Sequence, residues 1–275
     1  MIAPAPADWR RALPWPAADI HKHMRGRLGV VSGRATQTGA ARLAARAGLR
    51  IGAGLVRILC PPDAAGVIAS AVEAVMLAPF GSSEALFEAA EAMDAMVIGP
   101  AAGVNETTQA NLRALAETGA VLVVDADGLT AFEHRPSDLF ELLDRDDVLT
   151  PHAGEFARLF PDLAGVERDA AAREAAARSG AVVVLKGPAT VIAAPDGRLA
   201  VNDNGTPWLA TAGTGDVLAG MIGGLVAQRM DSFEAAQAAA WIHAEAARGF
   251  GPGLIAEDLP DRLPAVLADL YAARA

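Results

Sequence analysis

The chain has 275 residues, of which 52% are hydrophobic, and it contains 27 Gly and 17 Pro. This length and composition suit one large globular α/β domain better than a fibrous or disordered chain. The formal net charge is -10, which leaves no overall positive field to attract nucleic acid or an anionic membrane, so we expect neither as a partner. Cys60 is the only cysteine, which excludes an intrachain disulfide and a cysteine-rich metal site and fits a reducing cytoplasm.

The first part of the chain differs from the rest, and we expect residues 1–24 to form an N-terminal arm and residues 25–275 to form one domain. The arm holds several prolines and lacks the continuous apolar stretch of a signal peptide. No uncharged apolar run of about 18 residues occurs elsewhere, so no membrane-spanning helix is expected. His21, His23 and Met24 lack the fixed spacing of metal ligands. We therefore predict no protein metal site in the arm.

From residue 28 onward, short apolar runs alternate with Ala-rich amphipathic stretches, which is typical of βαβ units around a mainly parallel sheet. The last two predicted strands flank a turn at Asp196-Gly197 and indicate an antiparallel hairpin at one edge. The predicted strands are Leu28–Ser32, Leu55–Leu59, Met96–Ile98, Val121–Val124, Asp147–Leu149, Ala181–Leu185, Thr190–Ala194 and Leu199–Asn202.

The last third of the chain changes to helical periodicity, with apolar residues three and four apart over Thr214–Gln228, Ser232–Arg248 and Glu257–Ala273. We expect these helices to cover the sheet. Residues that cap helix N-termini precede or begin several predicted helices, namely Asn105, Ser232 and Asp258.

The segment Ala210–Gly220, A-T-A-G-T-G-D-V-L-A-G, carries the strongest functional signal. Small residues over Ala212, Gly213, Thr214 and Gly215 let the backbone approach an anion, and the helix that follows offers free N–H groups. Asp216 in its first turn is placed to accept a proton from a hydroxyl that attacks a phosphoryl group. The alternative is a glycine-rich turn in which Asp216 only balances the helix dipole.

Further polar residues follow predicted strands, where ligands of open α/β sheets bind. Lys186 ends an apolar strand and is placed to reach a phosphate, although a solvated strand-end lysine is the alternative. His152 lies in a loop after a strand, a position that suits contact with a ligand. A purely structural role for this histidine is an equally open alternative. Asp125 and Asp127 are candidates for ordering metal-bound water or substrate, or Asp127 caps the helix that starts at Gly128.

Six segments together resemble the ADP- or ATP-dependent NAD(P)H-hydrate dehydratases of the ribokinase-like superfamily, over roughly residues 25–273. One is the Ala210–Gly220 segment. The others are T-G-A-A-R-L-A-A-R-A-G-L-R-I-G-A-G-L-V at 38–56, V-D-A-D-G-L at 124–129, L-T-P-H-A-G-E at 149–155, L-K-G-P-A-T-V at 185–191 and G-L-I-A-E-D-L at 253–259. The resemblance implies a three-layer α/β/α sandwich with a mainly parallel central sheet.

The resemblance also implies roles for individual residues. Ala40, Gly103, His152 and Asp216 match positions that contact the hydrated nicotinamide nucleotide, and Asp216 matches the catalytic base. The positions matching the adenine-nucleotide site are Lys186, Gly187, Pro188, Ala189, Thr190 and Gly215. The implied co-substrate is ADP or ATP with Mg²⁺, and the implied reaction converts the S epimer of NAD(P)H-hydrate to NAD(P)H.

The chain departs from the family pattern at two glycines. In the Gly99–Gly103 loop, Ala101 replaces a glycine that commonly lets the backbone approach the ligand closely. At the start of the anion-binding turn, Ala212 stands where a second glycine is common. Because alanine disfavours positive φ, we expect the first loop to sit slightly differently over the substrate.

Two other functions remain open on this sequence. A ribokinase-like kinase of a vitamin-precursor alcohol would use the same Asp216 and would release a stable phosphorylated product. A catalytically silent nucleotide-binding protein would bind without turnover. For the dehydratase, the resemblance implies a homo-oligomer, and we expect a separate NAD(P)H-hydrate epimerase.

Overall fold

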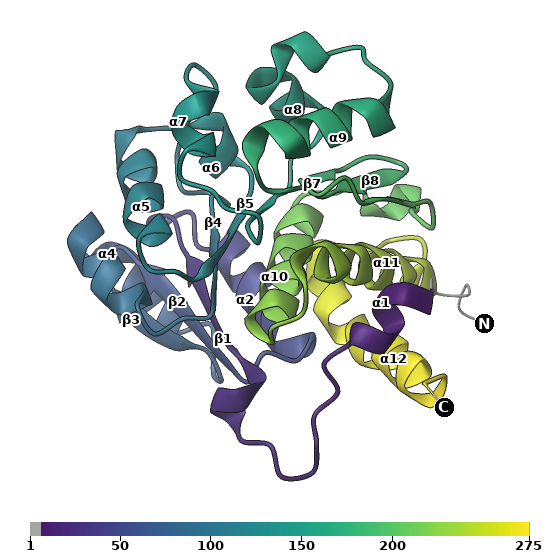
Figure 1. The fold of residues 1–275 in the computed structure, drawn as a ribbon. Helices are drawn as coiled ribbons and strands as arrows, with labels where there is room; N and C mark the ends of the chain where they lie inside the picture. Colours follow the sequence, from purple (N-terminus) through teal and green to yellow (C-terminus); the bar gives the residue numbers. More distant parts are fainter. Residues whose placement is uncertain (1–6, 275) are drawn as a thin grey trace.

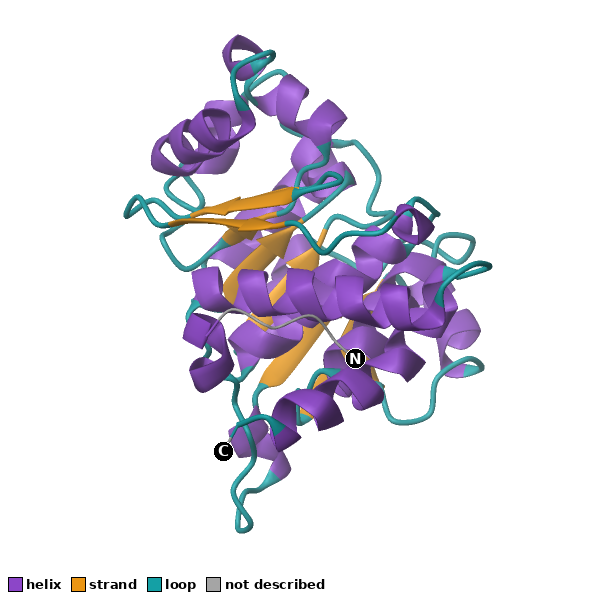
Figure 2. Cartoon of the chain, turned by 90° about the vertical axis from the view of Figure 1, so that its right-hand side faces the viewer, coloured by secondary structure: helices purple, strands orange, loops and turns teal. Residues whose placement is uncertain are grey.

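The computed structural model describes residues 7–274, which form a nine-stranded sheet between two layers of helices (Figures 1 and 2). The strand order is β3-β2-β1-β4-β5-β6-β7-β8-β9. Strands β1 to β7 are parallel, and β8 and β9 are antiparallel. The strands are β1 (Arg27–Val31), β2 (Leu55–Cys60), β3 (Met76–Pro79), β4 (Ala95–Ile98), β5 (Val121–Val124), β6 (Val148–Leu149), β7 (Val182–Leu185), β8 (Thr190–Ala193) and β9 (Leu199–Asn202).

Twelve α-helices lie within the described residues, and the later ones agree with the predicted helices to within a few residues at each end. The helices are α1 (Ala7–Ala12), α2 (Gly39–Arg50), α3 (Pro62–Ala69), α4 (Ser83–Ala90), α5 (Glu106–Ala116), α6 (Asp127–Thr130), α7 (Pro136–Phe140), α8 (Ala153–Leu159), α9 (Arg168–Ser179), α10 (Thr214–Ala227), α11 (Ser232–Phe250) and α12 (Leu259–Ala272). Short 3-10 turns span Lys22–Arg25, Pro161–Leu163, Pro207–Leu209 and Ala256–Asp258.

Two hydrophobic cores lie on the two faces of the sheet because strand side chains alternate between them. Val30 and Ile58 belong to one core with α2, α3, α10, α11 and α12. Val31 and Leu59 belong to the other core with α4 to α9. Helix α10 lies centrally, packed on β1, β4 and β5 as well as on α2. This places the first turn of α10 at the carboxyl edge of the parallel strands.

The structure corrects several local predictions. Strand β3 was not predicted, because its apolar run is short and ends at Pro79, and its residues at the sheet edge are half-buried or exposed. Helix α11 is capped by Asp231, one residue before the predicted cap Ser232. The Asp231 carboxylate accepts hydrogen bonds from the N–H groups of Phe233 and Glu234. Asn105 caps α5 as predicted. Asp258 precedes α12, but its carboxylate accepts from the N–H of Ile255 instead.

Helix α1 of the N-terminal segment is packed against the main domain. Trp9 is 1% exposed, and its ring lies 5.6 Å from that of Trp241 on α11. Figure 1 shows α1 beside α11 and α12. Residues 1–6 of the predicted arm lie outside the described residues, and the division at residue 24 stays a prediction.

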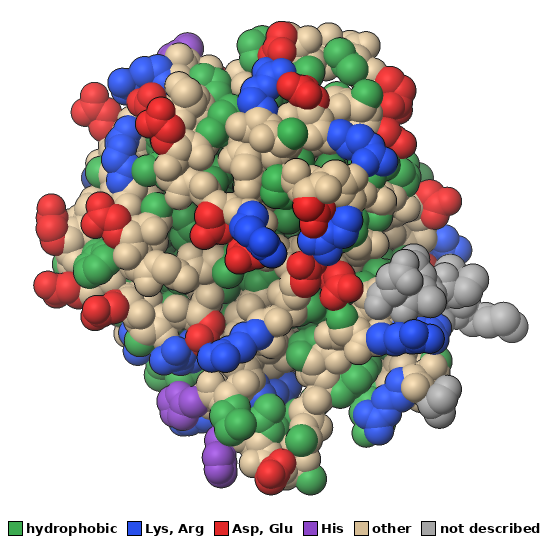
Figure 3. Space-filling view, in the orientation of Figure 1, with side chains coloured by type: hydrophobic (Ala, Val, Ile, Leu, Met, Phe, Trp, Pro, Cys, Tyr) green, Lys and Arg blue, Asp and Glu red, His purple; other side chains and the backbone are tan. Residues whose placement is uncertain are grey.

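Surface charge is mixed on the face that Figure 3 presents, where Lys and Arg side chains are scattered among Asp and Glu. Among the described residues, no helix combines the length and the apolar character that crossing a membrane requires.

Candidate active site

The predicted site residues meet at the carboxyl edge of the sheet. Gly103 follows β4, Asp125 follows β5, His152 follows β6 and Lys186 follows β7. Parallel strands present all their carboxyl ends at one edge, so residues far apart in sequence come together there. The N-terminus of α10, with Asp216, faces the same edge, since the charges of Asp125 and Lys186 both act on Asp216.

A buried ion pair forms the centre of the site. The Nζ atom of Lys186 lies 2.7 Å from Oδ1 of Asp125, whose side chain is 2% exposed. The loop that carries Lys186 is fixed by its backbone N–H, which donates to the carbonyl of Pro151. A Cβ placed on Gly215 would lie 3.5 Å from Nζ of Lys186. Glycine at 215 therefore keeps the space above this ammonium group open, in line with the predicted approach of a phosphate.

Helix α10 begins with backbone N–H groups that no described side chain caps. Gly213 is its N-cap at φ 89°, and no described side chain caps this end. The Thr214 hydroxyl instead donates to the carbonyls of Leu209 and Thr211 and holds the preceding segment in place. The first-turn N–H groups and the positive end of the helix dipole are thus left for an anion.

Asp216 lies in this first turn and is half-buried. Burial and the charge of Asp125 together raise the pKa of its carboxyl to about 6, against the opposing effect of the Lys186 charge. A carboxyl with this pKa is ionised at neutral pH yet more basic than an ordinary aspartate, which suits a general base.

The loop after β4 approaches the Asp125 segment very closely. Gly99 has φ 124°, and a Cβ there would lie 1.7 Å from the carbonyl oxygen of Asp125. Asp127 is the first residue of α6 and does not cap it, contrary to one alternative, because Ala126 is the N-cap. The Asp127 carboxylate accepts from the N–H of Gly103 at 2.9 Å. Asp127 therefore positions the predicted substrate loop.

Ala101 adopts φ 57°, within the left-handed region. Alanine here occupies a backbone conformation that glycine adopts more readily, and the expected shift of this loop over the substrate stays a prediction. Such a conformation costs an alanine about 1 kcal/mol. Ala126, at φ 49°, is a second such residue beside the site.

His152 is the N-cap of α8. Its Nδ1 accepts from the N–H groups of Gly154 and Glu155, and the Glu155 carboxylate accepts from the N–H of His152. An Nδ1 that accepts two hydrogen bonds carries no proton, so the ring hydrogen lies on Nε2. Glu155 thereby completes a capping box at the start of α8. The imidazole is exposed on its Nε2 side, 3.4 Å from the Glu155 carboxylate.

A cavity of about 580 Å³ lies between the loop after β7 and the start of α10. Lys186, Gly187, Pro188, Thr190 and Gly215 from the predicted nucleotide site line it, together with His152 and the side chains of Leu209 and Leu218. Apart from Lys186, His152 and His243, the walls of this cavity are apolar or uncharged. Such walls suit the flat face of a nucleotide base.

Two further residues were not predicted to act here, one behind the loop that lines the cavity and one in the lining itself. Arg168 at the start of α9 donates to the carbonyls of Leu185 and Ala189 and holds the loop from behind. His243 on α11 lines the cavity and is 6% exposed. No described group bonds its Nε2. Burial lowers the pKa of His243 to about 4, so the imidazole is neutral at neutral pH.

Three predicted residues lie at the margin of the site. Ala189 does not line the cavity, and its carbonyl faces Arg168. Ala212 is exposed just before the N-cap of α10. Ala40 lies in the first turn of α2, three residues before Leu43, whose side chain would meet a Cβ on Gly213. The roles of all three stay predictions.

Comparisons with known proteins agree with this arrangement. A family model described as NAD(P)H-hydrate dehydratase matches residues 28–264. The ADP-dependent (S)-NAD(P)H-hydrate dehydratase of Xanthomonas campestris is 36% identical over 94% of this chain and 93% of its own length. The bifunctional NAD(P)H-hydrate repair enzyme Nnr of Salinibacter ruber is 38% identical over 94% of this chain and 51% of its own. The chain thus spans about half the length of the first curated relatives that it matches.

Among solved structures, the ADP/ATP-dependent NAD(P)H-hydrate dehydratase of Bacillus subtilis, co-crystallised with ATP/Mg²⁺, superposes with a TM-score of 0.81 at 28% identity, covering 95% of this chain and 96% of that one. The predicted ribokinase-like α/β fold is thereby confirmed. With its fold, its carboxyl-edge cleft and a family model over most of its length, this chain belongs to the NAD(P)H-hydrate dehydratase family.

Proposed function

We propose that this protein dehydrates the S epimer of NAD(P)H-hydrate to NAD(P)H and uses ADP or ATP as phosphoryl donor. The activities of the Xanthomonas and Bacillus relatives support the substrate and the donor. The observation that carries the proposal is the placement of Asp216, a base with a raised pKa, in the first turn of α10 beside the Asp125–Lys186 pair.

The adenine nucleotide binds in the cavity between the loop after β7 and α10, with its terminal phosphates on Lys186 and the first-turn N–H groups. Asp216 takes the proton of the ring hydroxyl, whose oxygen bonds to the terminal phosphorus while the bond from phosphorus to the nucleotide breaks. The ring nitrogen then drives cleavage of the C–O bond, and phosphate leaves. The neighbouring ring carbon loses a proton, which restores the dihydronicotinamide.

Mg²⁺ fits this site through its donor set, because Asp125 and Asp216 are two carboxylates close enough to influence each other. Magnesium is typically held by one or two carboxylates and by substrate phosphates. Asp125, together with the nucleotide phosphates, would hold the ion, which would neutralise charge on the transferring phosphoryl group. The described residues hold no group of three or more His, Cys, Asp or Glu side chains that would form a metal site without a substrate.

The supply of substrate requires a partner activity. The protein acts on one epimer, so we propose that an NAD(P)H-hydrate epimerase provides it and that both act in the cytoplasm as parts of a repair sequence. We also propose a homo-oligomer.

The test is the formation of NADH from prepared NADH-hydrate with Mg²⁺ and either ADP or ATP, followed by the absorbance of the reduced nicotinamide. Asp216→Asn is the matched variant, because it keeps the side-chain shape and removes the base. We expect nucleotide-dependent NADH formation that falls about a thousandfold in the variant. A stable phosphorylated product would instead identify a small-molecule kinase, and absence of NADH with both nucleotides would contradict the proposal.

A further inference from the structure

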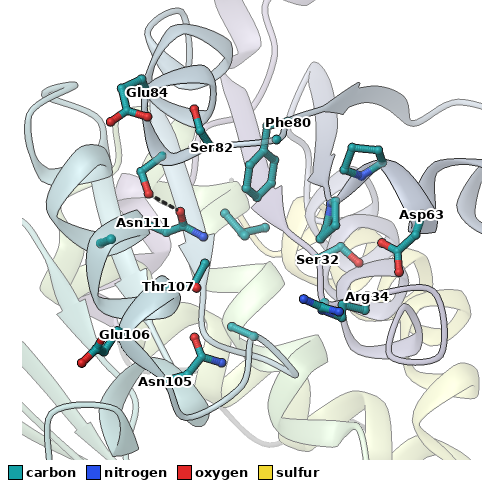
Figure 4. Close-up of a pocket in the computed structure, with 18 residues that line it drawn as sticks. Ser32, Arg34, Asp63, Phe80, Ser82, Glu84, Asn105, Glu106, Thr107 and Asn111 are labelled. Carbon is teal, nitrogen blue, oxygen red and sulfur yellow. Dashed lines mark hydrogen bonds between the residues drawn. The ribbon is translucent and has the colours of Figure 1, made fainter.

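A second, larger pocket lies at the carboxyl edge on the other side of Gly103. Its volume is about 920 Å³, and it is lined by residues that follow β1, β2, β3 and β4 (Figure 4). The chain runs outward from β1 to β2 and β3 and then returns to β4 on the opposite side of β1. This reversal of strand order is where open α/β sheets bind ligands.

Ser32 marks the floor of this pocket. It follows β1 and is 3% exposed, and its Oγ has no hydrogen-bond partner among the described residues. A buried hydroxyl without a partner costs free energy unless another group bonds to it. Because Ser32 lines the pocket, a ligand atom at this position would supply the missing bond.

Arg34 supplies the positive charge of the pocket. It is exposed and forms no ion pair with any described carboxylate. Figure 4 shows its guanidinium pointing across the cavity toward Asn105. An arginine in this position suits a phosphate group.

The remaining walls match a nucleoside. Pro61, Pro62 and the largely buried Phe80 provide apolar surface for a base. Asp63 and Glu106, in the first turns of α3 and α5, offer carboxylates at the rim that accept hydrogen bonds from ribose hydroxyls. One cation, hydroxyl acceptors and an apolar wall are the groups that a nucleoside phosphate requires.

The pocket adjoins the loop after β4, and the next residue of that loop is bonded to the segment that carries Asp125. Ala102 lines the pocket, and Gly103 is held by Asp127 beside the Asp125–Lys186 pair. In the proposed reaction the hydrated ring lies at Asp216 and the phosphoryl donor fills the cavity of Lys186 and Pro188. The second nucleotide of the hydrated dinucleotide therefore needs a separate space.

We propose that this pocket binds the adenosine-phosphate half of NAD(P)H-hydrate, with Arg34 on a phosphate and Ser32 bonded to the ligand. This inference rests on the proposed function. It assigns the dinucleotide and the phosphoryl donor to opposite sides of Gly103.

The experiment compares NADH-hydrate with hydrated, reduced nicotinamide mononucleotide, which has the reacting ring but lacks the second nucleotide. Binding of each is measured by calorimetry in the Asp216→Asn background, and KM for each and for ADP is measured with the base intact. Arg34→Gln is expected to weaken NADH-hydrate about tenfold and Ser32→Ala a few-fold. Neither change should alter the affinity for the mononucleotide or the KM for ADP. Arg11→Gln, on α1 outside the pocket, should change nothing.

Equal effects on both hydrates, or no effect on either, would overturn the pocket assignment even if the enzyme turns over normally. Failure of the proposed function looks different, because NADH-hydrate would then give no NADH in the unaltered protein. The calorimetric comparison would still decide the pocket, and absence of any binding of NADH-hydrate would contradict the assignment.

Discussion

The two cavities on either side of Gly103 differ in the chemistry of their walls. The cavity beside α10 is enclosed by glycines, prolines and leucines, with charge only at Lys186. The pocket beside β1 is rimmed by Arg34, Asp63, Glu84 and Glu106. The first suits a flat base whose phosphates extend to a helix N-terminus, and the second suits a ligand with hydroxyls and a phosphate near solvent. The same sheet edge can therefore separate two nucleotides by wall polarity.

The largest effect is expected at the charged end of the α10 cavity. Lys186→Met removes the ammonium and leaves Asp125 buried without its partner. We expect the KM for ADP to rise about a hundredfold, with a lowered melting temperature and little change in KM for the hydrate. Arg46→Met, which breaks an exposed ion pair with Asp261, is the matched control and should change neither KM. An unchanged KM for ADP in the lysine variant would place the phosphates elsewhere.

A pH profile tests Asp216, the base in the first turn of α10. The carboxyl of Asp216 has a pKa raised to about 6, and it accepts a proton only when it is ionised. Below this pKa the base is protonated, so kcat/KM should rise with pH and level off above about 7, with a loss of about tenfold per unit on the acid side. Stopped assays with each hydrate at saturating ADP provide the measurement. The decisive range runs from about pH 5 to about pH 7, one unit on either side of the pKa of Asp216. A flat profile over this range would exclude Asp216 as the base.

The smallest effect is expected at the base end of the α10 cavity. His243→Phe keeps an aromatic ring and removes the nitrogen that no described group bonds. If Nε2 contacts the nucleotide, KM for ADP should rise a few-fold to about tenfold, whereas kcat and KM for the hydrate should stay constant. The exposed His134, changed to Phe, serves as control. A purely structural histidine would instead lower the melting temperature and leave KM for ADP unchanged.

Much of the fold could be predicted from the sequence because buried parallel strands are continuous apolar runs, as at Val121–Val124 and Val182–Leu185. Asp216 could also be found, since its signal is local: glycines, a helix start and an acid within a few residues. Strand β3 was missed although Met76–Pro79 is apolar, because the run has only four residues and ends in a proline, which is unfavourable in a central strand. The α11 cap was predicted one residue late because Asp231 and Ser232 are both good capping residues.

The site residues that the sequence did not predict were missed for a different reason. Ser32, Arg168 and His243 gain their roles only when distant segments meet at the sheet edge, so no local pattern distinguishes them from ordinary polar residues. The Lys186–Asp125 pair joins residues 61 positions apart. Sequence identified both residues as candidates, but their direct contact became clear only from the sheet order.

The central claim is that the hydroxyl of the hydrated ring is phosphorylated at Asp216 before it leaves. The most direct measurement uses NADH-hydrate whose ring hydroxyl carries a heavy oxygen isotope, turned over with unlabelled ADP or ATP, and mass spectrometry of the released phosphate. The account predicts that the label appears in the phosphate, because the ring oxygen becomes bonded to phosphorus and leaves with it. Label recovered in water, with unlabelled phosphate, would contradict it and would indicate direct dehydration of the ring.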